Sequence, residues 1–378
     1  MRFNLQHSNT PLLQHSITPT LHGQSLRNSL AFAMTSTSYR PLVHRTAVAT
    51  AIVALLPIGV GALVTSMKAG MAFRDWPSSD GQFMLTYPWL ADFVRGAMDK
   101  FVEHGHRLAG ILIGVTSILL AAVVRRFERR HWVRGLAAGI LGCVVVQGLL
   151  GGGRVLADDP RLAMVHGNFA AVVFCLMGTL CVVTSRQWME SWRMLPASAR
   201  TLAASATESD AGSVRHDGQP AGGDLSLLKT LSVVTVAAVY GQFILGGRQR
   251  HLHDMLYEHL AGAVLVAVVV IATVVCAFRT RIGWIRATAF WMLFFLLTQA
   301  ALGAGAWVTK YGFASTGYVA VHGTPLQLAV RSGHTVVGML LLMTSVVLAL
   351  RVMRLTHRQR GSSPQFVPAQ LSTEGGAR

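Results

Sequence analysis

Eight long apolar runs, separated by short charged segments, constrain this 378-residue chain more than any other feature. Each run is close to the roughly 20 residues that a helix needs to cross a bilayer. Hydrophobic residues make up 52% of the sequence and charged residues 13%, a balance unusual for a soluble protein. We predict an all-α membrane protein with transmembrane helices at 42–66, 101–124, 132–153, 162–184, 227–247, 255–278, 283–308 and 330–353.

The formal net charge of +17 does not indicate nucleic-acid binding. The basic residues gather in alternate connections between the apolar runs, as they do in cytoplasmic loops of membrane proteins. This distribution predicts a protein of the bacterial inner membrane with both termini in the cytoplasm. The four cysteines lie inside apolar runs without a CxxC pair, so neither a zinc site nor a disulfide framework is expected.

The sequence looks duplicated. Gln147 in the third run and Gln299 in the seventh begin similar glycine-rich stretches, and Leu-Ala-Gly follows closely on both His106 and His259. Nearly equal spacings between such landmarks predict two tandem four-helix bundles, at 41–185 and 227–356. The segment 186–226 is expected to be a cytoplasmic linker, an extension at 1–40 and a tail at 357–378 are expected to be disordered, and Met34 is an alternative translation start.

Every second predicted helix carries one histidine near its outer end, namely His106, His166, His259 and His334. Because these four helices run in the same direction, the histidines should lie at a similar depth. Ionisable groups inside membrane spans are costly and usually functional, and neutral imidazole is a common axial ligand of haem iron. One such histidine could simply be hydrogen-bonded within the bundle. Four at one depth favour two bis-histidine haem sites.

Several charged residues near these histidines have two interpretations each. Glu103 shares a helix face with His106, where it could act as an acid or base or be a solvated carboxylate at a helix N-terminus. Arg107 could pair with a haem propionate or with Glu103, although an arginine that extends to the membrane interface is commoner. Arg248 and Arg250 could hold propionates or solvate an outer loop.

Other features of the outer loops are weaker signals. Asp75-Trp76-Pro77 could cap a haem pocket, or Trp76 could be an interfacial anchor. The histidines at helix ends and in loops are expected to be solvated, and they are His104, His131 and His322.

The residues quoted above resemble the haem A synthase family over about 41–354. The resemblance is carried by Glu103-His-Gly-His106-Arg107, by Gln147 with its Leu-Gly-Gly, by three further histidines and by Asp75-Trp76-Pro77. It implies a haem O oxidoreductase that converts the C8 methyl group of haem O to a formyl group, giving haem A. Hydroxylation is expected twice, the resulting diol then losing water.

The resemblance also implies roles for individual residues. Glu103 would be catalytic, His106 and His166 would bind the substrate haem in the first half, and His259 and His334 would bind haem b in the second. Haem O synthase and the machinery of cytochrome oxidase assembly are the implied partners, within membrane lipid and without nucleic acid. Homo-oligomer formation is left open.

The sequence departs from the family pattern in two places. It has no cysteine in its outer loops, so the redox disulfide of some bacterial members is not expected. The first outer loop lacks the usual basic, Gly/Ser-rich pattern, and Lys68 or Arg74 would then contact the propionates.

Two other functions fit parts of the pattern. A b-type electron-transfer cytochrome would use the four histidines for two haems, but it does not require the carboxylate of Glu103. A transporter would fit the duplication and the glycine-rich helices, but transporter sites usually lie near the membrane midplane. The sequence therefore favours the enzyme.

Overall fold

The computed structural model describes residues 39–190 and 222–361. The chain divides into Met1–Tyr39 and Arg40–Arg378, and all the described residues except Tyr39 belong to the second unit. Most of the predicted extension, linker and tail lies outside the described residues, so the disorder predicted for the extension and the tail stays a prediction.

The described residues form eight long helices and no β-strand. All eight are long and apolar enough to cross a membrane, which makes this a multi-pass membrane protein and confirms the eight predicted spans. Most of these helices exceed the predicted bounds by a few residues. The eight are α2 (Pro41–Met67), α4 (Met98–Phe127), α5 (His131–Ala157), α6 (Pro160–Thr184), α9 (Gly222–His251), α10 (Leu256–Arg279), α11 (Gly283–Tyr311) and α12 (Pro325–Gly361).

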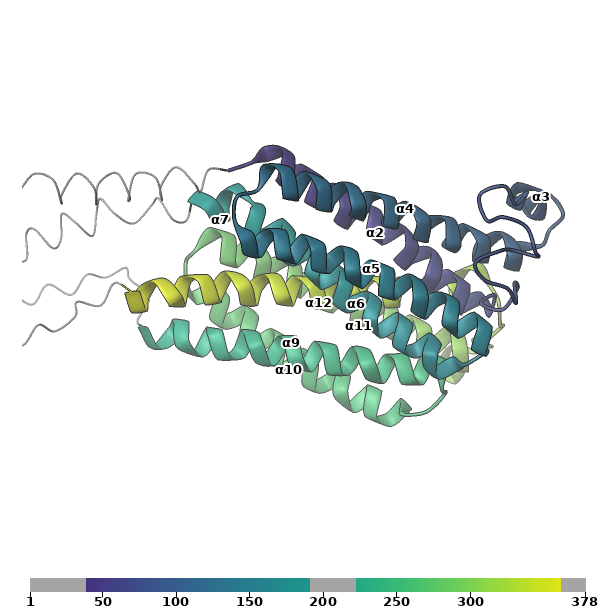
Figure 1. Cartoon of the computed structure of the whole chain (residues 1–378). Coiled ribbons are helices and arrows are strands. Elements are labelled where there is room, and N and C mark those ends of the chain that lie inside the picture. Colours follow the sequence, from purple (N-terminus) through teal and green to yellow (C-terminus); the bar gives the residue numbers. More distant parts are fainter. Residues whose placement is uncertain (1–38, 191–221, 362–378) are drawn as a thin grey trace, which may run out of the picture. The chain divides into compact units, whose positions relative to one another are not determined.

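Three short helices lie in the connections: α3 (Trp89–Val94), α7 (Arg186–Glu190) and the 3₁₀ helix η1 (Ala314–Thr316). Figure 1 shows α3 at one end of the long helices and α7 at the other. We call the first of these the α3 end. The helices α2, α5, α9 and α11 finish there, and α4, α6, α10 and α12 begin there.

Local sequence accounts for several helix boundaries. Pro41 and Pro160 occupy first-turn positions, where a missing N–H costs no hydrogen bond. The Asp159 side chain caps α6 by accepting from the Arg161 N–H at 2.7 Å. The C-terminal end of α2 lies at Lys68, which adopts a left-handed conformation with φ 58°.

The predicted linker and tail contain more helix than expected. The helix α9 begins at Gly222 and α7 occupies Arg186–Glu190, both within the predicted linker. The helix α12 continues to Gly361, five residues into the predicted tail. Arg and Gln, which occur in α7 and at the end of α12, favour helix.

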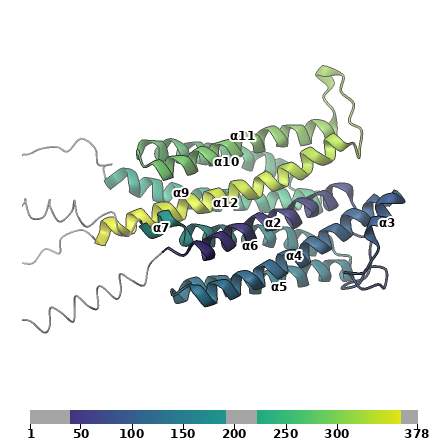
Figure 2. The same ribbon diagram turned by 90° about the horizontal axis from the view of Figure 1, so that it is seen from above.

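Each half is a closed ring of four helices. In the first half α2 contacts α4, α4 contacts α5, α5 contacts α6 and α6 contacts α2. In the second half α9, α10, α11 and α12 make the same four contacts in the same order. Figure 2 shows the two groups side by side. This equivalence is what a duplicated bundle would give, although duplication itself stays a prediction.

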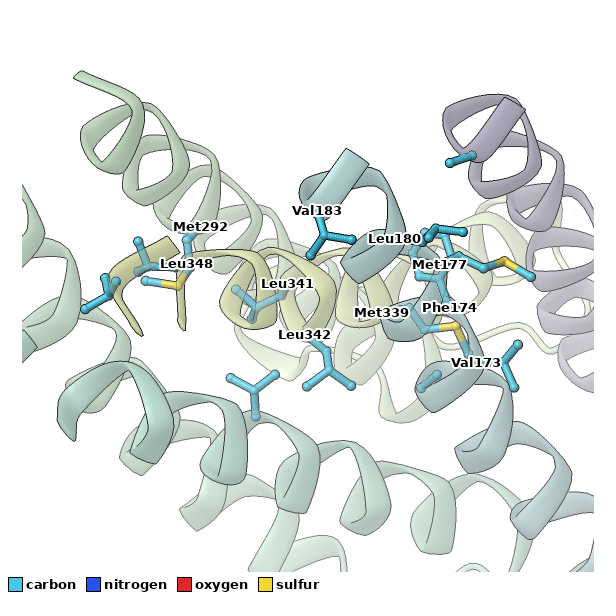
Figure 3. Packing of buried hydrophobic residues seen from close by; sticks show 14 of the residues in the cluster. Val173, Phe174, Met177, Leu180, Val183, Met292, Met339, Leu341, Leu342 and Leu348 are labelled. Atoms are coloured by element: carbon cyan, nitrogen blue, oxygen red, sulfur yellow. The ribbon is translucent and has the colours of Figure 1, made fainter. Parts of the chain in front are cut away.

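The halves meet along α6 and α12. These two helices contact each other, α6 also contacts α9, and α12 also contacts α2. The contact of α6 with α9 is equivalent to the contact of α12 with α2 when each helix is replaced by its counterpart in the other half. An approximate two-fold axis between the halves would give this pattern. The apolar core follows the seam, where Phe174, Met177 and Leu180 of α6 lie near Met339 and Leu342 of α12 (Figure 3).

Candidate functional site

Two of the four histidines that are predicted to bind haem lie close together in the first half, near the α3 end. The rings of His106 on α4 and His166 on α6 have centroids 6.3 Å apart and stand at 85° to each other. These two helices do not contact each other directly in the ring of four, so the imidazoles reach toward one another across the centre of the bundle.

The second half repeats this arrangement. His259 on α10 and His334 on α12 have ring centroids 6.3 Å apart at an angle of 80°. The structure therefore brings together the pairs that the sequence suggested.

The separation of the rings suits a haem iron with two axial imidazoles. Two metal–nitrogen bonds of about 2 Å on opposite sides of one iron, together with half the width of each ring, give about 6 Å between centroids. The Nδ1 atoms of His106 and His334 are buried without a hydrogen-bond partner. Such orphaned polar atoms are rare in native proteins and point to a missing ligand. The residues present therefore fit two bis-histidine haem sites.

A glycine on the neighbouring helix makes room for each imidazole. A Cβ atom built on Gly151 would lie 3.0 Å from Cε1 of His166, and Cβ atoms on Gly246 and Gly303 would lie 3.1 Å from Cε1 of His259 and His334. Gly61 has the same relation to His106, at 2.7 Å. A larger residue at any of these positions would displace a ring, which explains the glycines near the α3 end of α2, α5, α9 and α11.

Glutamine side chains lie against three of the four imidazoles. The Gln147 amide nitrogen lies 3.2 Å from Nδ1 of His166, and that of Gln242 lies 3.0 Å from Nδ1 of His259. The Gln299 amide nitrogen lies 3.2 Å from Nε2 of His334. In the sequence, Gln147 and Gln299 served only as landmarks and Gln242 was missed, although all three stand four residues before the glycines just described.

Glu103 is buried, with 1% of its surface exposed, and so is not the solvated carboxylate that was one of its two interpretations. Its Oε2 accepts hydrogen bonds from the backbone N–H groups of Ala72 and Phe73, at 2.7 and 3.2 Å. Its Oε1 lies 3.0 Å from Nη2 of Arg107. The carboxylate therefore ties the loop that follows α2 to the start of α4, beside His106.

Arg107 completes this attachment. Its guanidinium donates to the carbonyl oxygens of Asp75 at 2.9 Å and Ser78 at 2.6 Å. Among its predicted roles, pairing with Glu103 is confirmed. An extended conformation toward the membrane interface is wrong, because the loop carbonyls and Glu103 surround the side chain and leave it 8% exposed.

Hydrogen bonds within the loop stabilise the turn after Asp75. Its carboxylate accepts from the N–H groups of Asp80 at 3.1 Å and Gly81 at 2.9 Å. Partial burial raises the pKa of Asp75, but the hydrogen bonds from Gly81, Ser78 and Asp80 outweigh it, so the pKa lies below its ordinary value.

Trp76 packs on a helix of the first half. A Cβ atom on Gly152 of α5 would collide with the indole ring of Trp76, so this glycine is where the loop reaches the bundle. Gly152 is the neighbour of Gly151, which faces His166. The geometry favours the interpretation of Asp75-Trp76-Pro77 as a cap over that of Trp76 as an interfacial anchor.

His104 is fully buried, so the expectation that it is solvated is wrong. Its Nδ1 lies 3.0 Å from the Ser79 hydroxyl, and its ring lies 4.8 Å from that of Tyr87. Burial, followed by a hydrogen bond to Asp92, raises the pKa of Tyr87 to about 12. The loop folds back over the start of α4, which sequence spacing did not reveal. His131 and His322 are exposed, as predicted.

The predicted propionate contacts have different environments. Lys68 and Arg74 are exposed. Arg248 forms an ion pair with Asp254 at 2.5 Å. Arg250 lies between the halves, where it donates to the Ala62 carbonyl. Its other acceptors include the hydroxyl groups of Ser66 on α2 and Thr335 on α12.

Sequence reasoning missed Arg154, the last basic residue of α5. Its guanidinium donates to the Gly70 carbonyl at 2.9 Å, and it lies within electrostatic range of His106, His166 and His251. The glycines before Arg154 were interpreted as a helix-packing feature, and the arginine that follows them was not considered.

Comparison with known proteins gives a consistent result for part of the chain. The family model COX15-CtaA, described as a cytochrome oxidase assembly protein, matches residues 17–178. A heme A synthase of Methylobacterium radiotolerans is 30% identical over 151 residues, which are 38% of this chain and 40% of the relative.

Two further relatives carry the same name. The heme A synthase of Symbiobacterium thermophilum is 35% identical over 127 residues, 32% of this chain and 38% of the relative. That of Paracoccus denitrificans is 30% identical over 131 residues, 33% of each chain. The chain thus spans two fifths or less of the length of these curated relatives.

Proposed function

This chain is related to the haem A synthase family, and from that relationship we propose that it is itself a haem A synthase. It would oxidise the C8 methyl group of haem O to a formyl group and so supply haem A to terminal oxidases. The observation that carries the proposal is the pairing of the four histidines at the same 6.3 Å separation in both halves, with the buried Glu103 next to only one pair.

The two pairs would have different tasks. We assign the substrate haem O to His106 and His166, because Glu103 and the loop anchored by it lie beside His106. We assign a resident haem b to His259 and His334, because Leu256 takes the position before His259 that Glu103 has before His106. When bound, haem b would supply one-electron redox chemistry near the substrate site.

Glu103 is the residue we propose as catalytic. Its carboxylate is fixed by two backbone N–H groups and by Arg107. A carboxylate held by three donors has a fixed orientation, so it is suited to orienting water near the reacting methyl group. Arg107 would hold the carboxylate in place, while the loop and Trp76 would limit the access of bulk water to the first-half pair.

The proposal includes a cellular setting. The distribution of basic residues supports a bacterial inner membrane location with cytoplasmic termini. The histidine pairs would then lie toward the periplasmic face. The residues 41–185 would form the substrate half and 227–356 the haem b half. Haem O synthase would provide the substrate, and the cytochrome oxidase assembly machinery would receive the product.

The test is haem analysis in a bacterium that makes haem O but lacks its own haem A synthase. Extracted haems are separated and identified by mass after expression of the full chain. We expect haem A with the unmodified protein, and we expect haem b but no haem A with Glu103→Ala. Two haem b per chain without haem A would contradict the proposal and indicate a b-type electron-transfer cytochrome. Haem A formation by Glu103→Ala would contradict the role of Glu103.

A further inference from the structure

The four imidazoles share one repeated arrangement that differs at a single residue. Each histidine ring lies against a glycine on a neighbouring helix, and for three of the rings the residue four positions before that glycine is a glutamine, namely Gln147, Gln242 or Gln299. For His106 it is Pro57.

The glutamines fix their histidines through the side-chain amide. Those of Gln147 and Gln242 donate to the backbone carbonyls of His166 and His259, at 3.0 and 2.8 Å, while lying beside the rings. These hydrogen bonds hold the main chain at each histidine, and the amide packed beside the ring restrains the position of that ring. Contacts that fix the position of a histidine ligand strengthen its binding to a metal.

His106 lacks this support. Proline has no side-chain amide that could donate to the backbone carbonyl of His106 or pack beside its ring. The space for an amide is nevertheless present. In the second half, the amides of Gln242 and Gln299 lie against Gly262 and Gly338, one turn after the histidines. The corresponding Gly110, one turn after His106, has open space where a Cβ would be.

We propose that Pro57 makes His106 the ligand that releases first, so that the first-half haem exchanges while the second-half haem is retained. The first pair has one supported and one unsupported imidazole, whereas both imidazoles of the second pair are supported. This inference rests on the proposed function, because it concerns the same two haem sites. It identifies Pro57, Gln242 and Gln299 as positioning residues that separate an exchanging site from a permanent one.

The test measures haem loss from the full-length protein to an excess of apomyoglobin. We expect a fast and a slow phase for the unmodified protein, and only the fast phase for His334→Ala, which empties the second site. Pro57→Gln should slow the fast phase about fivefold, as one added buried hydrogen bond would. Pro57→Met, similar in size but without an amide, should leave the fast phase unchanged.

The second half provides the reverse experiment. Gln242→Met should accelerate the slow phase about fivefold, and Gln299→Met provides the same test if that variant does not accumulate. The electron paramagnetic resonance g-values of the first-half ferric haem should change in Pro57→Gln but not in Pro57→Met, because a new hydrogen bond fixes the orientation of the imidazole.

Two results would overturn the inference. One is equal rates of haem loss from both sites of the unmodified protein, and the other is an equal effect of Pro57→Gln and Pro57→Met. Neither result would affect the proposed function, which fails separately if the unmodified protein makes no haem A.

Discussion

Glu103 and Arg107 lie one turn apart on α4, with 3.0 Å between Oε1 and Nη2, and both are almost fully buried. A buried ion pair is costly to form, and removing one partner leaves the other charge uncompensated. This pair is also the attachment point of the loop after α2, through two backbone N–H groups and two carbonyls. The same contacts therefore stabilise the loop and fix the carboxylate.

Removal of the arginine should destabilise the protein strongly. We expect Arg107→Ala to lower the free energy of unfolding by about 3 kcal/mol, because Glu103 stays buried without its cation. The double variant Glu103→Gln, Arg107→Ala should lose less than the sum of the single variants. Thermal unfolding in detergent, monitored by circular dichroism, measures each change. Strict additivity of the two changes would show that the pair is not coupled.

Glycines that face the imidazoles should be sensitive to the smallest substitution. Gly61→Ala places a Cβ 2.7 Å from Cε1 of His106, so the ring must move and the first-half haem spectrum should change or disappear. Gly59→Ala, two residues earlier on α2, meets nothing within 4 Å and should have no effect. Absorbance spectra of the two purified variants provide the comparison. Identical spectra would argue against the observed placement of His106.

The arginines Arg248 and Arg250 on α9 should differ sharply in their contribution to stability. Arg250→Met leaves carbonyl and hydroxyl acceptors between the halves without a donor, which should cost about 1–3 kcal/mol. Arg248→Met breaks a partly exposed ion pair with Asp254 and should cost less than about 1 kcal/mol. Chemical unfolding of both variants tests this order, and a larger loss for Arg248→Met would contradict it.

The loop turn at Asp75 should depend on pH. Because the folded-state pKa lies below the unfolded value of about 3.9, its contribution to stability is complete above that value and is lost as pH falls through the lower folded pKa. Hydrogen exchange of the Gly81 amide, corrected for intrinsic rates, should therefore stay slow at pH 5 and accelerate only below about 3.9. Asp75→Asn should remove this transition, and a transition that persists in the variant would assign it to another group.

Apolar patterning was sufficient to predict the membrane-spanning helices. Each of the eight runs is long enough to require a helix in a bilayer, so length and hydropathy alone predicted them. The common depth of His106, His166, His259 and His334 followed from the direction of their helices, without knowledge of side-chain contacts. Which of them pair was implied only by the resemblance to the haem A synthase family.

Features that depend on loop folding could not be predicted in the same way. His104 is buried because Ser79 and Tyr87 return to it from a loop with no periodic pattern. The carboxylate of Glu103 points toward backbone N–H groups about thirty residues earlier in the chain. Neither the register of that loop nor the role of Gln242 follows from helix spacing, since each depends on which side chains meet across helices.

The most direct test of two bis-histidine sites is the haem content per chain of three purified full-length proteins. Pyridine haemochrome analysis should give two haems for the unmodified protein, and one each for His166→Ala and His259→Ala. The remaining haem in each variant should keep a six-coordinate low-spin spectrum. An unchanged haem content in either variant, or a content of one haem or none in the unmodified protein, would contradict the assignment of the two histidine pairs.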